Sequence, residues 1–209
     1  MARIFLETPR LVLREFSADD VPEVHRLGAD PEVMRYLTGG RAVTWDEAVA
    51  KTREYVAGYE RFGGHGYWAA TERGSGRFLG TFKFHPEPVD EPGNFELGYR
   101  LHRWTWGAGY ATEGAIALLR KGFAECGVER AWAQTMAVNR GSRRVMEKAG
   151  LRYVRTFFQE RPQGPIPGHE HGDVEYAVTR RQWLAEGEDP GARREPGRAE
   201  GRAPRRPHP

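Results

Sequence analysis

One stretch decides how this chain folds: Trp106-Gly107-Ala108-Gly109-Tyr110-Ala111-Thr112. The residues before it, 94–101, alternate apolar and polar side chains with a period of two, which predicts a strand. The residues after it, 111–126, place their apolar side chains on one face of a helix. Glycines let a backbone approach a ligand closely, and the first amides of a helix have no helical partners. Because the helix dipole adds partial positive charge there, the sequence predicts a phosphate-binding turn at residues 107–112.

A Gly-x-Gly turn also fits a helix that merely needed a tight start, so the motif alone is weak. Two other phosphate-binding motifs do not fit the spacing. The dinucleotide-binding fingerprint needs a third glycine where this chain has Thr112. A P-loop ends in Gly-Lys-Ser/Thr, and that ending is absent here.

The composition indicates one domain followed by a tail. With 209 residues and 39% hydrophobic side chains, the chain can build one α/β core, and no apolar run reaches membrane-spanning length. We expect the domain at residues 1–186 and an unstructured tail at residues 187–209. Residues 190–209 hold six Arg, two Glu, five Pro and three Gly, and cannot bury enough surface to fold alone. The residues before them hold 26 basic and 27 acidic side chains, so the net charge of +3 comes from the tail.

The basic charge therefore does not indicate that the core binds nucleic acid. A solvated extension is the favoured interpretation of the tail, and a tail that contacts RNA or an acidic partner is the alternative. The single cysteine, Cys126, cannot form an internal disulfide and is expected to be a buried, inert thiol. The N-terminus has no signal-peptide signature, and together these features favour a reducing, cytoplasmic setting.

Periodicity and capping patterns predict strands and helices along the whole domain. Helices are expected to begin near Ser17, Asp30 and Thr44, the first and third of which have capping-box spacing, and to span 111–126 and 140–148. Strands are expected at residues 10–16, 67–71, 78–84, 94–101, 130–138, 151–159 and 174–179. Trp183 is expected to cap the core. The fold class is therefore α/β, with a mixed sheet in mostly sequential strand order and helices on both faces.

Further segments narrow this class. Residues 139–151 read Asn-Arg-Gly-Ser-Arg-Arg-Val-Met-Glu-Lys-Ala-Gly-Leu, and Glu-Leu-Gly-Tyr at 96–99 precedes the glycine turn. With residues 7–14, 30–34, 106–113 and 173–176, they resemble the GNAT acetyltransferases, and within them the RimJ/RimL-type branch of ribosomal-protein N-acetyltransferases. The resemblance covers about residues 7–185. It implies the GNAT fold, a mostly antiparallel twisted sheet of about seven strands with helices on both faces and a splayed central strand pair.

The resemblance implies acetyl-CoA as the acyl donor, with its pyrophosphate on backbone amides from Trp106 through Ala111. Its pantetheine arm would pair like an extra strand with the end of the strand at 94–101. Trp104 stands where the superfamily prefers Gln or Arg, so the adjacent Arg103 is the candidate side-chain contact. The donor-binding residues implied are Leu101, Arg103, Trp106, Gly107, Ala108, Gly109, Tyr110, Ala111, Thr112, Asn139 and Ser142.

The resemblance also implies direct transfer of the acetyl group to a primary amine in a ternary complex, which needs a base to deprotonate the amine. Glu96 is the first candidate, and its alternative is a solvent-facing charge on an alternating strand. Glu160 is the second candidate. Ser142 is the candidate group at the CoA sulfur, with helix capping as its alternative. Asn139 would bind the pantetheine arm or the substrate, and capping of the helix at 140–148 can coexist with that role. Favourable interaction with the helix dipole explains Glu113 without catalysis.

The remaining chemistry-bearing residues have weaker cases. Tyr99 and Tyr110 are candidate acids, although aromatic packing is favoured for both. His169, His171 and Asp173 would share one strand face and suggest a metal, but a fourth ligand is missing, so no metal is expected. Core packing is favoured over substrate stacking for three tryptophans, Trp104, Trp106 and Trp132.

Several functional alternatives stay open at this point. The acceptor amine is either a protein N-terminus, including that of a ribosomal protein, or a small molecule. A non-catalytic acyl-CoA-binding or sensor domain, and a transferase that uses another acyl-CoA donor, are the competing functions. The sequence leaves a monomer and a homodimer as alternatives.

Overall fold

The computed structural model describes residues 2–88, 91, 93–161 and 164–185. The predicted tail at 187–209 lies outside the described residues. Within them, no helix is both long and apolar enough to cross a lipid bilayer.

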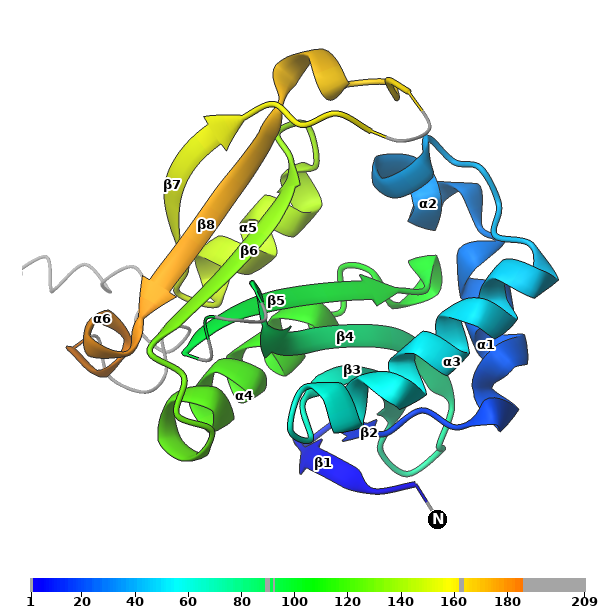
Figure 1. The fold of residues 1–209 in the computed structure, drawn as a ribbon, viewed down its shortest axis with the longest axis horizontal. Helices are drawn as coiled ribbons and strands as arrows, with labels where there is room; N and C mark the ends of the chain where they lie inside the picture. The colour runs from blue at the N-terminus through cyan, green and yellow to red at the C-terminus, as the bar shows by residue number, and fades with distance from the viewer. Residues whose placement is uncertain (1, 89–90, 92, 162–163, 186–209) are drawn as a thin grey trace, which may run out of the picture.

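Eight strands form one sheet in the order β1-β2-β3-β4-β5-β6-β8-β7 (Figure 1). Residues 4–7 form a strand of their own, which adds one to the seven predicted. Neighbouring strands are antiparallel except β5 and β6, and β8 enters between β6 and β7 as the one departure from sequential order. The strands are β1 (Ile4–Glu7), β2 (Leu11–Arg14), β3 (Gly66–Glu72), β4 (Phe78–Pro86), β5 (Asn94–Leu101), β6 (Arg130–Met136), β7 (Arg152–Phe157) and β8 (Asp173–Thr179).

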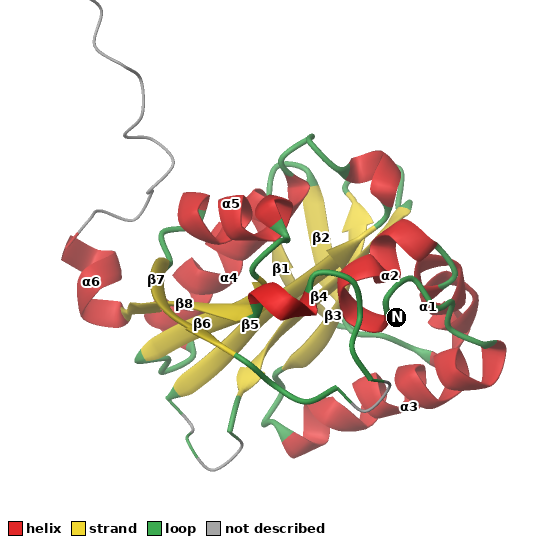
Figure 2. Cartoon of the chain, turned by 90° about the horizontal axis from the view of Figure 1, so that it is seen from above, coloured by secondary structure: helices red, strands yellow, loops and turns green. Residues whose placement is uncertain are grey.

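Helices cover both faces of the sheet, as predicted (Figures 1 and 2). On one side lie α1 (Val21–Gly28) and α3 (Trp45–Arg61), with α2 (Pro31–Thr38) beside α1. On the other side lie α4 (Tyr110–Glu125) and α5 (Arg140–Lys148). After β8 comes α6 (Arg180–Ala185), whose Trp183 is 2% exposed and packs on Phe123 at a ring-centroid distance of 5.7 Å. The prediction that Trp183 caps the core is therefore confirmed.

The helices begin where the capping patterns place them. Thr44 Oγ1 accepts from the Glu47 amide at 3.2 Å, and the Glu47 carboxylate accepts from the Thr44 amide at 2.8 Å, so α3 begins at Trp45. At the start of α2, Asp30 Oδ1 accepts from the Glu32 amide at 2.9 Å. The reciprocal pair at Thr44 and the single bond at Asp30 satisfy amides that a helix start leaves without partners.

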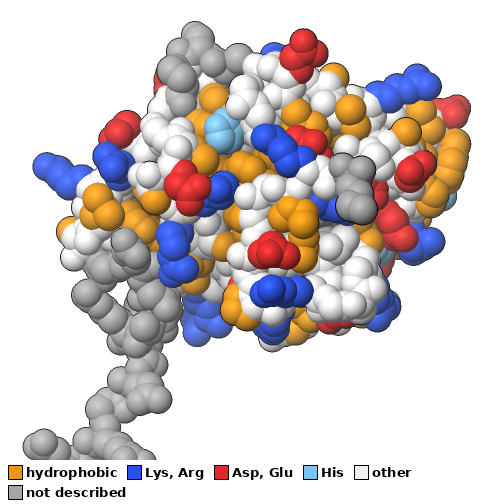
Figure 3. Space-filling view, turned by 90° about the horizontal axis from the view of Figure 1, so that it is seen from below, with side chains coloured by type: hydrophobic (Ala, Val, Ile, Leu, Met, Phe, Trp, Pro, Cys, Tyr) orange, Lys and Arg blue, Asp and Glu red, His pale blue; other side chains and the backbone are white. Residues whose placement is uncertain are grey.

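Basic and acidic side chains are interspersed over the face of the molecule seen in Figure 3. They do not gather into one basic band on that face, which is the arrangement that nucleic-acid binding usually needs.

The two halves of the sheet are joined by a short parallel pairing. The register pairs of β5 and β6 are Asn94 with Arg130, Phe95 with Ala131 and Glu96 with Trp132. Beyond them, β5 continues to Leu101 paired with β4, and β6 continues to Met136 paired with β8. The central strands therefore diverge after Glu96, which confirms the predicted splayed pair.

Two glycines let α4 pack closely on β4. A Cβ atom on Gly114 would lie 2.3 Å from Phe82 Cζ, and one on Gly122 would lie 2.6 Å from Phe84 Cζ. Both phenylalanines are fully buried, so their rings have little room to move. The close contact fixes where the first turn of α4 stands relative to the sheet.

Replacing Gly114 with Ala should lower the free energy of unfolding by about 1–3 kcal/mol, because the added methyl overpacks against Phe82. Gly141→Ala is the matched control, since its Cβ would meet only Asn139 Oδ1 at 3.7 Å. This control should be neutral or stabilise the fold by up to about 1 kcal/mol. Urea unfolding followed by circular dichroism measures both, and equal changes would contradict the close packing.

Candidate functional site

The glycine turn presents backbone amides at the start of α4. Gly107 has φ = 77° and Gly109 has φ = 86°, a left-handed conformation that other residues rarely adopt. The Glu113 amide donates to the Gly109 carbonyl at 3.0 Å and begins the helical ladder. The amides of Tyr110, Ala111 and Thr112 therefore precede that ladder and can receive a ligand.

Two backbone amides of the predicted phosphate-binding turn already donate hydrogen bonds within the protein. The Trp106 amide donates to the Arg103 carbonyl at 3.1 Å, and the Ala108 amide donates more weakly to the Thr105 carbonyl at 3.4 Å. These bonds hold the turn in shape. The anion-binding capacity of the turn consequently lies on the glycines and on the first residues of α4.

A carboxylate on α4 ties the turn to the first hairpin. Thr8 Oγ1 donates to Glu113 Oε1 at 2.6 Å, and the Arg10 backbone amide donates to the same oxygen at 3.1 Å. Arg10 Nε donates to Glu113 Oε2 at 2.6 Å, while its Nη1 donates to the Ala108 carbonyl at 2.8 Å. Burial raises the pKa of Glu113, but the hydrogen bonds from Thr8 and Arg10 outweigh it and leave that pKa below its ordinary value.

The helix dipole is therefore an incomplete account of Glu113, because Thr8 and Arg10, two residues not predicted to belong to the site, hold its carboxylate. The signal was present in the opening Thr-Pro-Arg, but nothing local shows that it meets a residue 103 positions later. Tyr110 is also tied, since its hydroxyl donates to Glu72 Oε1 at 2.9 Å, which keeps its proton engaged at the end of β3.

Two hydroxyl groups meet where α5 faces β5. Tyr99 Oη donates to the Ser142 carbonyl at 3.0 Å and lies 3.1 Å from Ser142 Oγ. Burial raises the pKa of Tyr99 far above its ordinary value despite the hydrogen bond with Ser142, so the phenol keeps its proton at neutral pH. Asn139, rather than Ser142, is the cap of α5, because its Oδ1 accepts from the Ser142 amide at 3.2 Å. The capping alternative is thus correct for Asn139 and wrong for Ser142.

Glu96 lies on the other face of β5 and is ion-paired with Lys83 of β4. Its side chain is 13% exposed, so the alternative of a solvent-facing surface charge is wrong. Burial raises the pKa of Glu96, and the nearby Lys83 offsets this rise only in part. A carboxylate with a raised pKa is a better proton acceptor than an ordinary glutamate.

Glu160, the second candidate base, lies far from Glu96. It is exposed in the segment after β7 and lines a hollow of about 420 Å³ together with Arg161 and His169. The register places Met136, Asp173 and Phe157 side by side at that end of the sheet, whereas Glu96 sits beside Trp132. The four-residue difference along β6 corresponds to about 13 Å. No hydrogen bond or ion pair found among the described residues joins the two carboxylates.

The histidine segment does not form the strand face that was expected. Residues 169–171 form a short 3-10 helix, and β8 begins only at Asp173. Arg161 Nη2 donates to both oxygens of Asp173, at 2.7 and 2.9 Å. Over the described ranges, no three His, Cys, Asp or Glu side chains gather as metal ligands would.

The tryptophans near the turn were also misassigned. Trp104 and Trp106 are 47% and 49% exposed, so core packing is wrong for both, whereas Trp132 is half-buried. Trp106 Nε1 donates to the Leu101 carbonyl at 2.9 Å and braces the end of β5. The Arg77 guanidinium carbon lies 3.6 Å from the centroid of the Trp104 ring. Arg103, the residue before Trp104, is exposed in the short 3-10 helix that leads into the turn.

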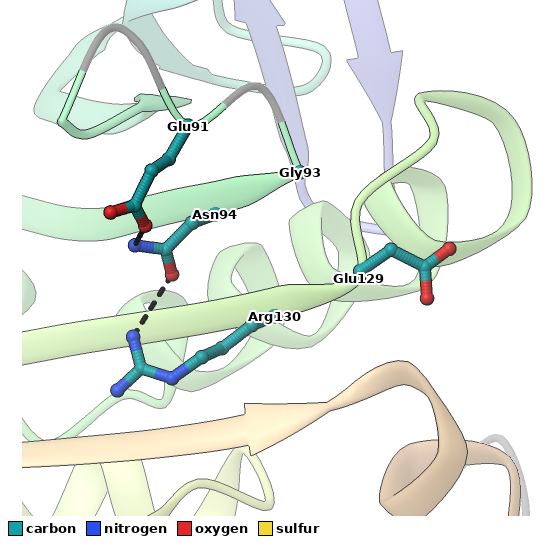
Figure 4. A pocket seen from close by; sticks show the side chains of 5 residues that line it. All are labelled: Glu91, Gly93, Asn94, Glu129 and Arg130. Atoms are coloured by element: carbon teal, nitrogen blue, oxygen red, sulfur yellow. Dashed lines mark hydrogen bonds between the residues drawn. The ribbon is translucent and has the colours of Figure 1, made fainter.

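A second hollow, of about 470 Å³, lies where β5 and β6 are still paired (Figure 4). Asn94 accepts from Arg130 Nη1 at 2.9 Å and donates to Glu91 at 3.0 Å, so its polar groups are joined to one another. This hollow is at the opposite end of β5 from the glycine turn and is lined by no residue of the predicted site. We therefore regard it as part of the junction between β5 and β6 and not as part of the candidate site.

Three comparisons identify proteins similar to this chain. The family model of the acetyltransferase (GNAT) domain matches residues 10–152. The FsC-acetyl coenzyme A-N(2)-transacetylase of Aspergillus fumigatus is 36% identical over 185 residues, covering 86% of this chain and 77% of that protein. A GNAT-family acetyltransferase structure from Bacillus anthracis has a TM-score of 0.71 at 26% identity, covering 85% of this chain and 99% of that one. The RimL ribosomal L7/L12 α-N-protein acetyltransferase in complex with coenzyme A has a TM-score of 0.68 at 17% identity, with coverage of 85% and 98%.

Glu113→Gln should lower the free energy of unfolding by about 1–2 kcal/mol at pH 7, because charge-assisted bonds from Arg10 and Thr8 are lost. Since the folded-state pKa of Glu113 is lowered, its contribution is present above the pKa of an unfolded glutamate and disappears as the pH falls. The difference from wild type should therefore shrink between pH 7 and pH 3 in urea unfolding. Glu125→Gln, which removes an exposed carboxylate of α4 paired with Lys121, is the control; an equal loss in both variants would rule out the tether.

Proposed function

This chain belongs to the GNAT family of acetyltransferases, and we propose that it transfers the acetyl group of acetyl-CoA directly to a primary amine. The observation that supports this most is the position of the glycine turn. Its free amides stand at the end of β5, the strand that separates from β6 after Glu96. A turn suited to the phosphates of a donor and an unpaired strand edge are thus next to each other.

The residues present fit acetyl-CoA. The backbone amides of Gly107, Gly109 and the first turn of α4 suit its pyrophosphate, because anions bind well at helix N-termini. The edge of β5 between residues 97 and 101 faces away from β4 and is not paired with β6, so an extended pantetheine arm can pair with it. An amide on this edge would also hydrogen-bond the thioester oxygen as charge develops on it.

When bound, acetyl-CoA supplies an activated acyl group whose leaving group is a thiolate. Glu96 accepts a proton from the incoming ammonium, directly or through a water molecule, so that the amine nitrogen can attack the carbonyl carbon. The Tyr99 and Ser142 hydroxyls stand on the opposite face of β5. Ser142 Oγ gives its proton to the sulfur as the carbon–sulfur bond breaks, and the second proton released by the attacking nitrogen, relayed by water, restores the hydroxyl. Base and acid are thus separated by one strand.

The class of the acceptor amine is inferred from the relatives of the chain. The relative from A. fumigatus is named as an N(2)-transacetylase, which supports transfer to nitrogen. RimL, whose name gives a ribosomal protein α-amine as its acceptor, shares the fold at 17% identity. A thiol-release assay with a panel of small amines and of peptides with free N-termini, each with acetyl-, propionyl- and succinyl-CoA, tests both acceptor classes and the donor. Tight acyl-CoA binding without amine-dependent thiol release would favour the sensor function instead.

Glu96→Gln should lower kcat by about 10²–10⁴, the usual contribution of a positioned base. Because the pKa of Glu96 is raised, wild-type activity should fall as the pH drops through a value above that of an ordinary glutamate, and this limb should vanish in the variant. Steady-state thiol release between pH 5 and 9 measures it. Glu87→Gln, which lies 3.9 Å from the same Lys83 but outside β5, is the matched control. An unchanged rate in Glu96→Gln would remove Glu96 from the reaction.

Ser142→Ala should lower kcat with little change in the KM for acetyl-CoA, because its hydroxyl acts on the leaving thiolate rather than on the bound donor. Tyr99→Phe should lower kcat less, since it removes the neighbour that orients Ser142. Comparing acetyl-CoA with an acetyl thioester of a more acidic thiol checks this. A better leaving group should restore the Ser142→Ala rate, and equal losses with both donors would show that Ser142 is not the acid.

A further inference from the structure

One arginine near the proposed site, Arg100, has no anionic partner among the described residues. Arg100 is half-buried, its Nη2 donates to Tyr55 Oη at 3.1 Å, and its Nη1 lies 3.3 Å from Met34 Sδ. Its Nε is buried without a hydrogen-bond partner. A thioether is a weak acceptor and a phenol is neutral, so the positive charge is poorly compensated.

The other half-buried arginines are better satisfied. Arg14, Arg130 and Arg161 each pair with a carboxylate, at 2.7, 2.6 and 2.7 Å respectively. Arg143 donates to a backbone carbonyl at 3.0 Å and to Tyr176 Oη. Among the described residues, no carboxylate lies within ion-pair distance of Arg100. A guanidinium kept from water in this way is suited to receive an anion from a ligand.

The position of Arg100 assigns that ligand to the acceptor side. Side chains alternate along β5, so Arg100 shares a face with Glu96, whereas Tyr99 points to the opposite face and meets Ser142 of α5. The glycine turn heads α4, which also covers the Tyr99 face. The face that carries Arg100 is the one whose side chains contact α2 and α3. The donor phosphates and Arg100 are thus on opposite sides of the strand.

We propose that Arg100, oriented by Tyr55, binds a carboxylate of the acceptor, so that the substrate is a small amine that also carries a carboxylate group. This inference rests on the transferase function proposed above. Nε and an adjacent Nη of a guanidinium form a planar fork that matches the two oxygens of a carboxylate. A single negative charge suffices, because the other basic side chains found at this face of β5 are already paired: Lys83 with Glu96, and Arg130, which contacts Asn94, with Glu175.

The geometry also fits such a substrate. The Cα atoms of Glu96 and Arg100 are about 13 Å apart along the strand. Between them lies Gly98, over which the Lys83 side chain extends to reach Glu96; a Cβ on Gly98 would be 3.2 Å from Lys83 Cβ and 3.6 Å from its Cδ. An amine near Glu96 and a carboxylate near Arg100 can therefore belong to one extended molecule that runs along this face of β5 past the Lys83 side chain.

The test compares ω-amino acids of increasing chain length with their carboxamides, in wild type, Arg100→Gln and Arg53→Gln. The last variant removes an exposed arginine of α3 and is the matched control. Wild type and the control should prefer the acids in kcat/KM, whereas Arg100→Gln should lose about 10- to 100-fold on the acids and little on the amides. The KM for acetyl-CoA should not change. Equal losses on acids and amides, or a raised KM for acetyl-CoA, would overturn the proposal.

A binding measurement keeps this test separate from the transferase function. Calorimetric titration of the same acids into CoA-saturated protein should show binding by wild type and Arg53→Gln, and its loss in Arg100→Gln with an unchanged melting temperature. If acids bind but no amine is acetylated, the anion site stands and the transferase proposal fails. If the CoA-saturated wild type binds none of the acids, the anion site is wrong even where amines are acetylated.

Discussion

Three register pairs hold the two halves of this sheet together, and the site depends on how early that pairing stops. Up to Glu96 and Trp132, β5 and β6 share a parallel ladder. Each strand then follows a different antiparallel neighbour, β4 or β8, and the two edges separate. Backbone amides and carbonyls demand partners, so an edge opened inside a sheet is a natural place for an extended ligand to pair.

The strand period of two gives β5 a different function on each face. Phe95, Leu97 and Leu101 pack into the core beneath α4, and Tyr99 on the same face reaches Ser142. Glu96 and Arg100 point the other way, toward groups on β4, α2 and α3. A single strand thus separates the proposed donor chemistry from the proposed acceptor chemistry, and its missing neighbour is what lets the two meet.

Local signals in the sequence predicted most of the elements, because caps and glycine turns act over a few residues. The capping box at Thr44, the turn at Gly107 and the limits of α5 all lie where the pattern placed them. The placement of β8 between β6 and β7 depends on pairings between distant strands, which no local pattern encodes. The same holds for the candidate site. Glu96 could be chosen from its strand, but its burial against Lys83, the tether from Arg10 and the exposure of Trp104 arise only from packing.

The tether between Glu113 and the first hairpin has a consequence for local opening of the chain. Arg10 holds a carboxylate of α4 and a carbonyl of the turn at once, so the hairpin cannot detach without releasing both. A ligand that binds the glycine turn only while Arg10 holds it must, by thermodynamic linkage, also reduce fraying of β1 and β2. Amide hydrogen exchange at Leu11 and Leu13 then becomes a remote report of whether the turn is occupied.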